Sequence, residues 1–200
     1  MTQPSFPRRR LLLSGVAALA LAACDSSAPQ FTSIDITGAD YATDFSLTDQ
    51  NGVTRTLADF KGKVVVVFFG FTQCPDVCPT SLSELAQARK LLGADGDRLQ
   101  GLFVSVDPER DTPEVMKAYM ASFDPSFLAL YASPGELPEL AKRFKIYYKK
   151  VPGSTPDNYS MDHSAGSYIY DPQGRVRLYF RYGSGAQAMA DDVKHLLRGA

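Results

Sequence analysis

The residues of this chain best suited to chemistry are two cysteines, Cys74 and Cys78, four positions apart. They lie between an apolar run at residues 64–69 and a stretch with helical periodicity at residues 81–92. The start of a helix has unpaired N–H groups and a positive dipole end, which favour thiolate over thiol and lower a cysteine's pKa. Thiolates attack disulfides and bind soft metal ions. This spacing lets the two sulfurs form a disulfide, act as a redox pair, or share one metal ion.

A pair of buried structural cysteines is the alternative, because free cysteine is among the most buried residue types and packs as a small hydrophobe. Two prolines argue against this alternative. Pro75 stiffens the loop between the sulfurs, and Pro79 suits the first position of a helix that begins there. A pair that only filled the core would need neither proline.

The surrounding elements predict an α/β protein of the thioredoxin-like class, with an N-terminal β-hairpin and a central mixed sheet flanked by helices. Residues 64–69 are an unbroken apolar run, typical of a central strand covered by helices on both faces, and residues 99–106 are predicted to be a second buried strand. The other predicted elements are a hairpin at residues 45–48 and 53–56, helices at 81–92, 113–120, 136–144 and 186–198, strands at 127–131 and 146–151, a surface loop at 152–159, and a hairpin at 167–170 and 176–182. In this fold the cysteine pair occupies the active-site position.

His163 is the candidate third ligand. The only other histidine, His195, is predicted to be a solvated residue of the last helix, whereas His163 is placed in a loop just before the strand that starts at Ser167. In a thioredoxin-like fold that loop packs against the cysteines. Two thiolates and one imidazole suit Cu(I), which accepts low coordination, whereas structural zinc would want a fourth protein ligand. Met161 and Asp162 are neighbours of His163, and we expect Met161 to pack or face solvent rather than to bind.

Length and charge fit a single domain. A chain of 200 residues with 44% hydrophobic composition can bury one sizeable core. The first 23 residues contain three arginines and no acidic residue, so the remaining 18 basic and 22 acidic residues give a formal charge of −4. A nucleic-acid partner is therefore not expected, since such a partner calls for a clustered basic face.

Residues 1–24 predict a signal peptide. Arg8, Arg9 and Arg10 precede an apolar run at residues 11–20 that is too short to span a bilayer. The sequence Leu-Ala-Ala-Cys at residues 21–24 resembles a bacterial lipobox, which implies that Cys24 is lipidated and becomes the first residue of the mature protein. An ordinary cleaved signal is the alternative.

The compartment follows from this leader. Asp25 resembles the signal that keeps some lipoproteins on the inner membrane, so we expect a lipid-anchored protein on the periplasmic face of the bacterial inner membrane. Residues 25–40 are predicted to be a flexible tether, and residues 41–200 the folded domain. The arginine run also resembles a twin-arginine export signal, so the export route, Sec or Tat, stays open. In this compartment a reduced cysteine pair depends on a reductant.

Three separated motifs resemble the Sco/SenC family, the thioredoxin-like copper chaperones for cytochrome c oxidase assembly. They are Gly-Phe-Thr-Gln-Cys-Pro-Asp-Val-Cys-Pro at residues 70–79, Val-Ser-Val-Asp-Pro-Glu-Arg-Asp-Thr-Pro at 104–113 and Asp-His-Ser at 162–164. The resemblance covers about residues 45–197. It implies copper bound by Cys74, Cys78 and His163, as Cu(I) with Cu(II) left open.

The resemblance also implies partners: subunit II of cytochrome c oxidase, whose dinuclear copper site would receive the metal, and other periplasmic copper carriers or thiol reductants. Gln73 stands where the family often has an aromatic residue or histidine, which bears on affinity or redox behaviour but not on the ligand set. A role in supporting the site or in forming a partner surface is compatible with three loop residues, Asp107, Arg110 and Asp111. Ordinary loop and helix-start chemistry explains these three equally well.

The cysteine pair also fits three other functions to different degrees, so an enzymatic activity is left as an alternative. A thiol-disulfide oxidoreductase would reduce protein disulfides such as that of the oxidase copper-site cysteines, but three residues separate the cysteines here and thioredoxin-type reductases have two. A peroxidase needs Pro-x-x-x-Thr-x-x-Cys, and Val67 and Phe71 occupy the first two of those positions. A redox or copper sensor acting through a partner is the last alternative.

Overall fold

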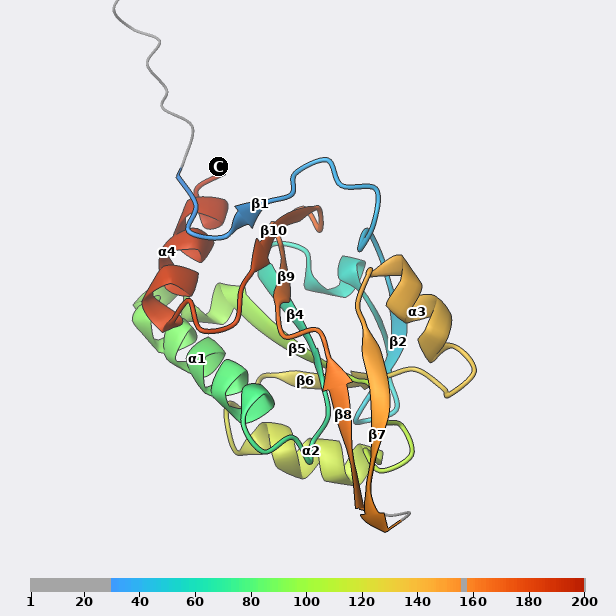
Figure 1. Cartoon of the computed structure of the whole chain (residues 1–200). Helices are drawn as coiled ribbons and strands as arrows, with labels where there is room; N and C mark the ends of the chain where they lie inside the picture. Colours follow the sequence, from blue (N-terminus) through green and yellow to red (C-terminus); the bar gives the residue numbers. More distant parts are fainter. Residues whose placement is uncertain (1–29, 156–157, 200) are drawn as a thin grey trace, which may run out of the picture.

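The structure is a computed structural model that describes residues 30–155 and 158–199. Its centre is an eight-stranded sheet in the order β1-β10-β9-β4-β5-β6-β2-β3 (Figure 1). These strands are β1 (Ile34–Asp35), β2 (Ser46–Asp49), β3 (Thr54–Thr56), β4 (Val64–Gly70), β5 (Leu99–Ser105), β6 (Leu128–Tyr131), β9 (Ser167–Tyr170) and β10 (Val176–Phe180). The helices are α1 (Val77–Leu91), α2 (Pro113–Ala121), α3 (Leu137–Arg143) and α4 (Ala186–Leu197), with 3-10 turns at Leu57–Phe60 and Gly93–Arg98.

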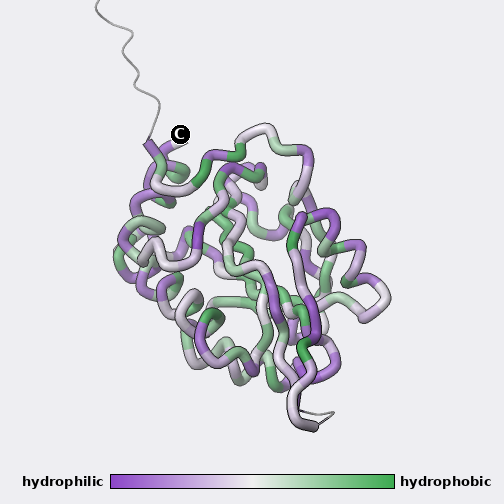
Figure 2. Tube along the Cα trace, viewed as in Figure 1, coloured by the Kyte–Doolittle hydropathy of each residue, from purple (hydrophilic) through white to green (hydrophobic). Residues whose placement is uncertain are grey.

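Strand β4 is the middle of this sheet, as its apolar sequence predicts. It pairs parallel to β5 and antiparallel to β9, and all of its residues are buried. Its side chains alternate between two covered faces: Phe68 lines a small cavity with Leu82 of α1, and the ring of Phe69 packs 5.0 Å from that of Phe144. Hydrophobic residues accordingly concentrate in the central strands (Figure 2). The mixed sheet with helices on both sides confirms the predicted fold class.

The helices cover the two faces of the large sheet. Helix α1 joins the parallel neighbours β4 and β5, and α1 and α4 lie side by side, while α3 lies across the sheet from them (Figure 1). Helix α1 begins at Val77. Pro79 is therefore its third residue, whereas the sequence had predicted the first position. Proline is tolerated there because the N–H groups of the first turn have no partner within the helix. Thr112 caps α2, as predicted, by accepting a hydrogen bond from the N–H of Val115.

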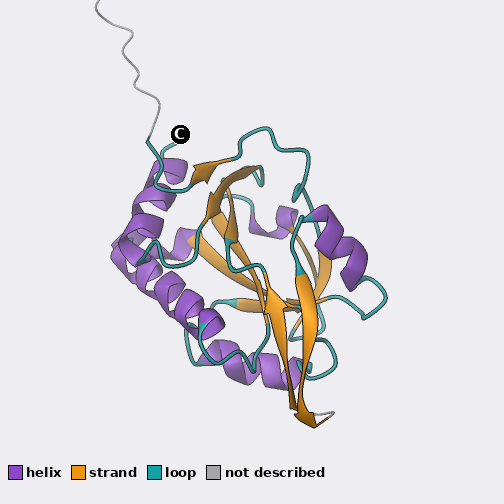
Figure 3. Cartoon of the chain, in the orientation of Figure 1, coloured by secondary structure: helices purple, strands orange, loops and turns teal. Residues whose placement is uncertain are grey.

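The predicted surface loop at residues 152–159 is wrong. Strand β7 (Tyr148–Thr155) pairs antiparallel with β8 (Asn158–His163) in a separate two-stranded sheet that extends from the body of the protein (Figure 3). Gly153 is needed for this pairing, because a Cβ atom there would lie 1.7 Å from the carbonyl oxygen of Asn158. The turn-forming residues therefore mark a close backbone approach within a hairpin. As a result, His163 is the last residue of a strand and not a loop residue.

The described part of the predicted tether is docked on the domain. Strand β1 pairs with β10, and the buried carboxylate of Asp192 on α4 accepts hydrogen bonds from the N–H groups of Thr32 and Ser33 and from the Ser33 hydroxyl. The predicted tether is therefore wrong for the docked residues 32–35, which belong to the folded unit. A two-residue strand has no periodicity to reveal it, and its partners lie far along the chain. The predicted signal peptide and Cys24 lie outside the described residues.

Candidate metal centre

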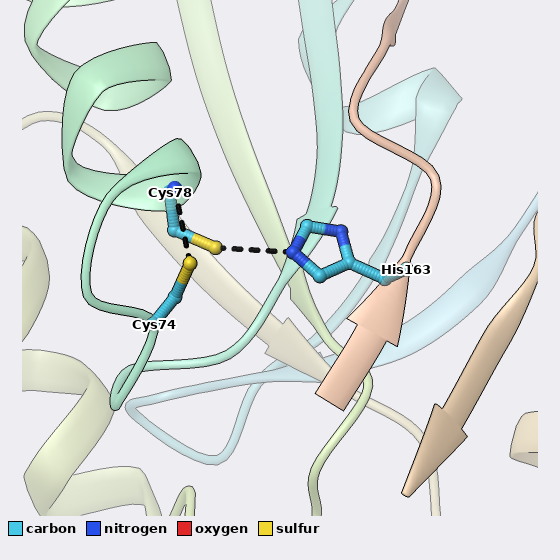
Figure 4. A group of neighbouring side chains, drawn as sticks. All are labelled: Cys74, Cys78 and His163. Carbon is cyan, nitrogen blue, oxygen red and sulfur yellow. Dashed lines mark hydrogen bonds between the residues drawn. The ribbon is translucent and has the colours of Figure 1, made fainter. Parts of the chain in front are cut away.

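The two cysteines follow the carboxyl end of β4. Cys74 is half-buried in the loop after Gly70, and Cys78 is fully buried in the first turn of α1. The N–H of Cys78 points at the Sγ atom of Cys74, 3.4 Å away (Figure 4). The N-terminal amide of the helix therefore stabilises negative charge on Cys74, the cysteine that precedes the helix.

Gly70 makes room for the buried sulfur. A Cβ atom at this position would lie 2.7 Å from the Sγ of Cys78 and 2.9 Å from the ring of Phe103. Only a residue without a side chain lets the Cys78 sulfur pack directly on the end of β4. Gly70 is the first residue of the motif at residues 70–79, but nothing in the sequence pattern indicates this packing role.

His163 reaches the cysteines because of the strand it ends. Along β8, Tyr159 and Met161 are buried while Ser160 and Asp162 are exposed, so the alternation of the strand directs His163 inward. Its Nε2 atom lies 3.4 Å from the Sγ of Cys78, across 85 positions of sequence (Figure 4). The predicted convergence of two sulfurs and one imidazole is therefore present in the structure.

The second nitrogen of the ring decides which atom can bind a metal. The Nδ1 atom of His163 lies 2.9 Å from the carbonyl oxygen of Ser164. A carbonyl oxygen only accepts hydrogen bonds, so Nδ1 carries the proton in the neutral ring, and Nε2 directs its lone pair at the sulfurs. Metal-binding histidines are commonly oriented by such a bond from the other ring nitrogen. The rings of Phe68 and Phe71 pack edge-on to the imidazole, at 6.0 and 5.8 Å.

The two thiols differ in acidity. A hydrogen bond from the Cys78 thiol lowers the pKa of Cys74 to about 4, against the opposing effect of burial and with further help from His163 and from the backbone N–H groups of Asp76 and Cys78. The same hydrogen bond, together with burial, raises the pKa of Cys78. The pair therefore holds one negative charge, on the more exposed Cys74, and one proton, on the buried Cys78.

The ligand set fits a single soft ion. The two Sγ atoms and Nε2 all lie within 4.8 Å of one another, and bonds of about 2.0 to 2.3 Å to a shared ion would bring them to roughly 4 Å. Met161 packs in the core, as predicted, and Asp162 is exposed, so neither neighbour of His163 adds a fourth ligand. Three ligands with two sulfurs favour Cu(I) over structural zinc.

His195 lies away from this centre. It is on α4, where its ring packs edge-on to Phe31 at 6.0 Å, so it is partly buried and not fully solvated as predicted. The group of possible metal ligands that the described residues form around the cysteines contains His163 and not His195.

Asp111 supports the cysteine loop, a role that the sequence analysis left undecided. Its buried carboxyl group accepts hydrogen bonds from the N–H and the hydroxyl of Thr72 and from the hydroxyl of Ser105 at the end of β5. Burial raises the pKa of Asp111. Because β4 and β5 are parallel neighbours, the residues after both strands meet at one edge of the sheet, which is the signal that could have identified this contact.

Comparison with known proteins gives a consistent result. A sequence model of the family described as SCO1/SenC matches residues 35–198. A SCO2-like protein of Rickettsia felis is 35% identical over 152 residues, which are 76% of this chain and 74% of that protein.

Solved structures agree. The structure of Bradyrhizobium japonicum ScoI with copper bound is 44% identical, with a TM-score of 0.70, and the match covers 76% of this chain and 97% of that one. A SCO1/SenC family lipoprotein from Bacillus anthracis is 28% identical, with a TM-score of 0.65, over 76% of this chain and 92% of that one.

Proposed function

This chain belongs to the SCO1/SenC family, and we propose that it carries Cu(I) on Cys74, Cys78 and His163 and delivers it to the dinuclear copper site of cytochrome c oxidase subunit II. One observation carries the proposal: two sulfurs and an imidazole nitrogen, 85 residues away in sequence, gather within 4.8 Å. The copper-bound relative from Bradyrhizobium japonicum supports copper as the cargo.

The chemistry of loading follows from the charges of the site. Cys74 is already a thiolate near neutral pH, and Nε2 of neutral His163 presents a lone pair. Cys78 must lose its proton, so loading releases one proton and weakens in acid. The half-buried Cys74 is the ligand that an approaching pair of target thiolates can reach first, and stepwise exchange of ligands would then move the ion.

We further propose that Cys24 is lipidated and holds the domain at the periplasmic face of the inner membrane. The support is the Leu-Ala-Ala-Cys sequence at residues 21–24 and the relative from Bacillus anthracis, which is a lipoprotein. In the part of the chain that the structure describes, no helix has the length and apolar character needed to cross a bilayer.

The test is an anaerobic Cu(I) titration of residues 25–200 in competition with a chromogenic chelator. The wild type should bind one equivalent, His163→Ala should bind more weakly, and Cys78→Ala should bind no stoichiometric copper. Loaded protein should then metallate the reduced, copper-free domain of subunit II. A wild type without stoichiometric copper, or a Cys78→Ala variant that binds like the wild type, would reject the proposal.

A thiol-disulfide reductase is the second candidate, and the asymmetry of the two sulfurs favours it. The Cys74 thiolate would attack one sulfur of a protein disulfide and expel the other as thiolate, forming a mixed disulfide. Cys78, after losing its proton, would then attack the Cys74 sulfur, which leaves the chain oxidised and the substrate reduced to two thiols. An external thiol reductant must restore the pair.

The role of His163 separates the two candidates. His163 would be a copper ligand, but none of its atoms forms or breaks a bond in disulfide exchange. His163→Ala should therefore impair copper binding and leave most of the rate of exchange with a model disulfide. A variant that loses both activities in equal measure would argue against the distinction.

A further inference from the structure

The strand that carries His163 is not part of the large sheet. Strands β7 and β8 pair only with each other among the described strands, and the hairpin extends from the body (Figure 3). Strand β8 itself has no backbone pairing with the large sheet, and the nearest paired residue after His163 is Ser167 of β9, opposite Phe68 of β4. Side-chain contacts must hold the rest of β8 against the cysteine loop, and Arg110, in the loop between β5 and α2, makes contacts on both sides of the gap.

Arg110 joins the cysteine loop to β8. Its Nη1 atom donates to the side-chain oxygen of Gln73, at 3.0 Å, and to the backbone carbonyl of Tyr159, at 2.8 Å. Gln73 is the residue directly before Cys74, and Tyr159 is on the same face of β8 as His163. One guanidinium nitrogen therefore contacts the segments that supply Cys74 and His163.

The same cluster holds the ring of Tyr159. The guanidinium of Arg110 stacks 3.5 Å from the ring centroid, and the Tyr159 hydroxyl donates to Asp107 at 2.7 Å. The buried carboxylate of Asp107 also accepts from Nε of Arg110 at 2.5 Å, which fixes the plane of the guanidinium. Stacking and a fork of directed N–H donors are properties of arginine that lysine lacks.

We propose that Arg110 is a positioning residue for copper binding: by holding Gln73 and Tyr159 together it fixes the gap between the two sulfurs and His163. The proposal deepens the copper-carrier function and rests on it. Without this link the hairpin samples positions in which Nε2 is too far from the sulfurs, and each copper ion that binds must first order it. Gln73 supplies one end of the link.

The first experiment measures Cu(I) affinity by chelator competition in the full-length chain, purified in detergent, with Cys24→Ser so that only the site cysteines bind. Arg110→Gln should weaken binding about tenfold, the lower end of the range for residues that orient metal ligands. In a His163→Ala background the same substitution should change affinity by less than about twofold, because the ligand that Arg110 positions is already gone. Arg110→Lys should not restore binding.

Arg55→Gln is the matched control. Arg55 also pairs through Nε with a buried carboxylate, Asp49, at 2.9 Å, but it belongs to β3 at the far edge of the sheet. This variant should bind copper like the parent chain. Gln73→Ala removes only the exposed end of the link and replaces Arg110→Gln in the experiment if that variant fails to fold. It should also lower the Cu(I) affinity.

The second experiment needs no copper. Amide hydrogen exchange of the apo protein should become faster across β7 and β8 in Arg110→Gln and Gln73→Ala, with the strands of the large sheet unchanged and with no effect of Arg55→Gln. Unchanged exchange of the hairpin would overturn the proposal.

The two experiments separate the proposal from the function on which it rests. If the parent chain binds no copper, the carrier function fails, and the exchange measurement still decides whether Arg110 holds the hairpin. If the parent chain binds copper and Arg110→Gln binds equally well, or loses the same factor with and without His163, the positioning role fails while the carrier function stands.

Discussion

The two regions that meet at the metal centre are held in different ways. The cysteine loop follows the middle strand of an eight-stranded sheet, and the buried carboxyl group of Asp111 ties it to β5 through Thr72 and Ser105. The β7–β8 hairpin belongs to no larger sheet, and several of its residues are exposed. Two ligands therefore come from the loop and helix that follow the central strand, and one comes from a hairpin outside the large sheet.

This difference indicates that the two regions have different roles at the metal centre. The cysteine side sets the charge and the position of the sulfurs before any ion arrives, because its geometry is determined by the core. The histidine side depends on a few side-chain contacts, so its position is easier to change. Under the proposed carrier function the ion must be released, and a third ligand on a weakly held hairpin is the ligand that can leave first. The following predictions test this comparison.

The largest effect is expected from removing a ligand on the cysteine side. Cys78→Ala should lower Cu(I) affinity by more than about a hundredfold, since losing even an outer partner of a metal ligand costs roughly ten- to a hundredfold. His163→Ala should cost less, because two thiolates remain to hold Cu(I). Chelator competition measures both constants. Equal losses would contradict a division between the two regions.

The pH dependence of Cys74 is the next largest effect. With its pKa lowered to about 4 from an ordinary 9.0, Cys74 is a thiolate at neutral pH, and its alkylation rate should stay constant as pH falls until it declines through about pH 4. Rates of carboxymethylation, read by mass spectrometry for each cysteine, check this. In denaturant the decline should begin near pH 9, and Cys78 of the folded chain should react slowly throughout.

Asp111→Ala should destabilise the fold by about 2–3 kcal/mol, because it leaves the Thr72 N–H and two hydroxyl groups without their acceptor. Urea unfolding gives the free energy. Asp192→Ala is a matched control, since Asp192 is equally buried and also accepts three hydrogen bonds, but on α4. Both should lower stability, and only Asp111→Ala should alter the alkylation rate of Cys74.

Gly70→Ala should cost about 1–3 kcal/mol, because its Cβ atom would overlap the Sγ of Cys78 and the ring of Phe103. It should also weaken Cu(I) binding by displacing the sulfur. Gly135→Ala, which meets no atom within 4 Å, is the control and should leave both quantities unchanged. Normal copper affinity in Gly70→Ala would show that the cysteine side is less rigid than we infer.

The smallest effect is expected on the hairpin surface. Lys150 of β7 pairs with Glu109 at 2.7 Å and lies 3.8 Å from the ring centroid of Tyr159, but both charged side chains are largely exposed. Lys150→Ala should change the free energy of unfolding by less than about 1 kcal/mol. Thermal and urea unfolding measure it, and a larger loss would mean that the hairpin is held more firmly than its lack of sheet pairing indicates.

Most elements of the core could be read from local pattern. The apolar runs of β4 and β5, the Asn51-Gly52 hairpin and the Thr112-Pro113 start of α2 are signals contained in neighbouring residues. Strands β7 and β8 were missed at residues 152–159, because the turn-forming residues there indicate only that the chain bends closely. Strand β1 was missed because it is two residues long and gains its stability from β10 and Asp192.

By itself, the sequence determined which atoms are available: two sulfurs at a strand-to-helix junction, one further histidine upstream of a hairpin, and a core large enough to hold them. Only the tertiary structure decided that His163 faces Cys78 and that Arg110 bridges the two sides. The physical reason is that residue type and spacing act locally, whereas these contacts join residues from 37 to 85 positions apart. Such distances are set by the packing of the whole domain.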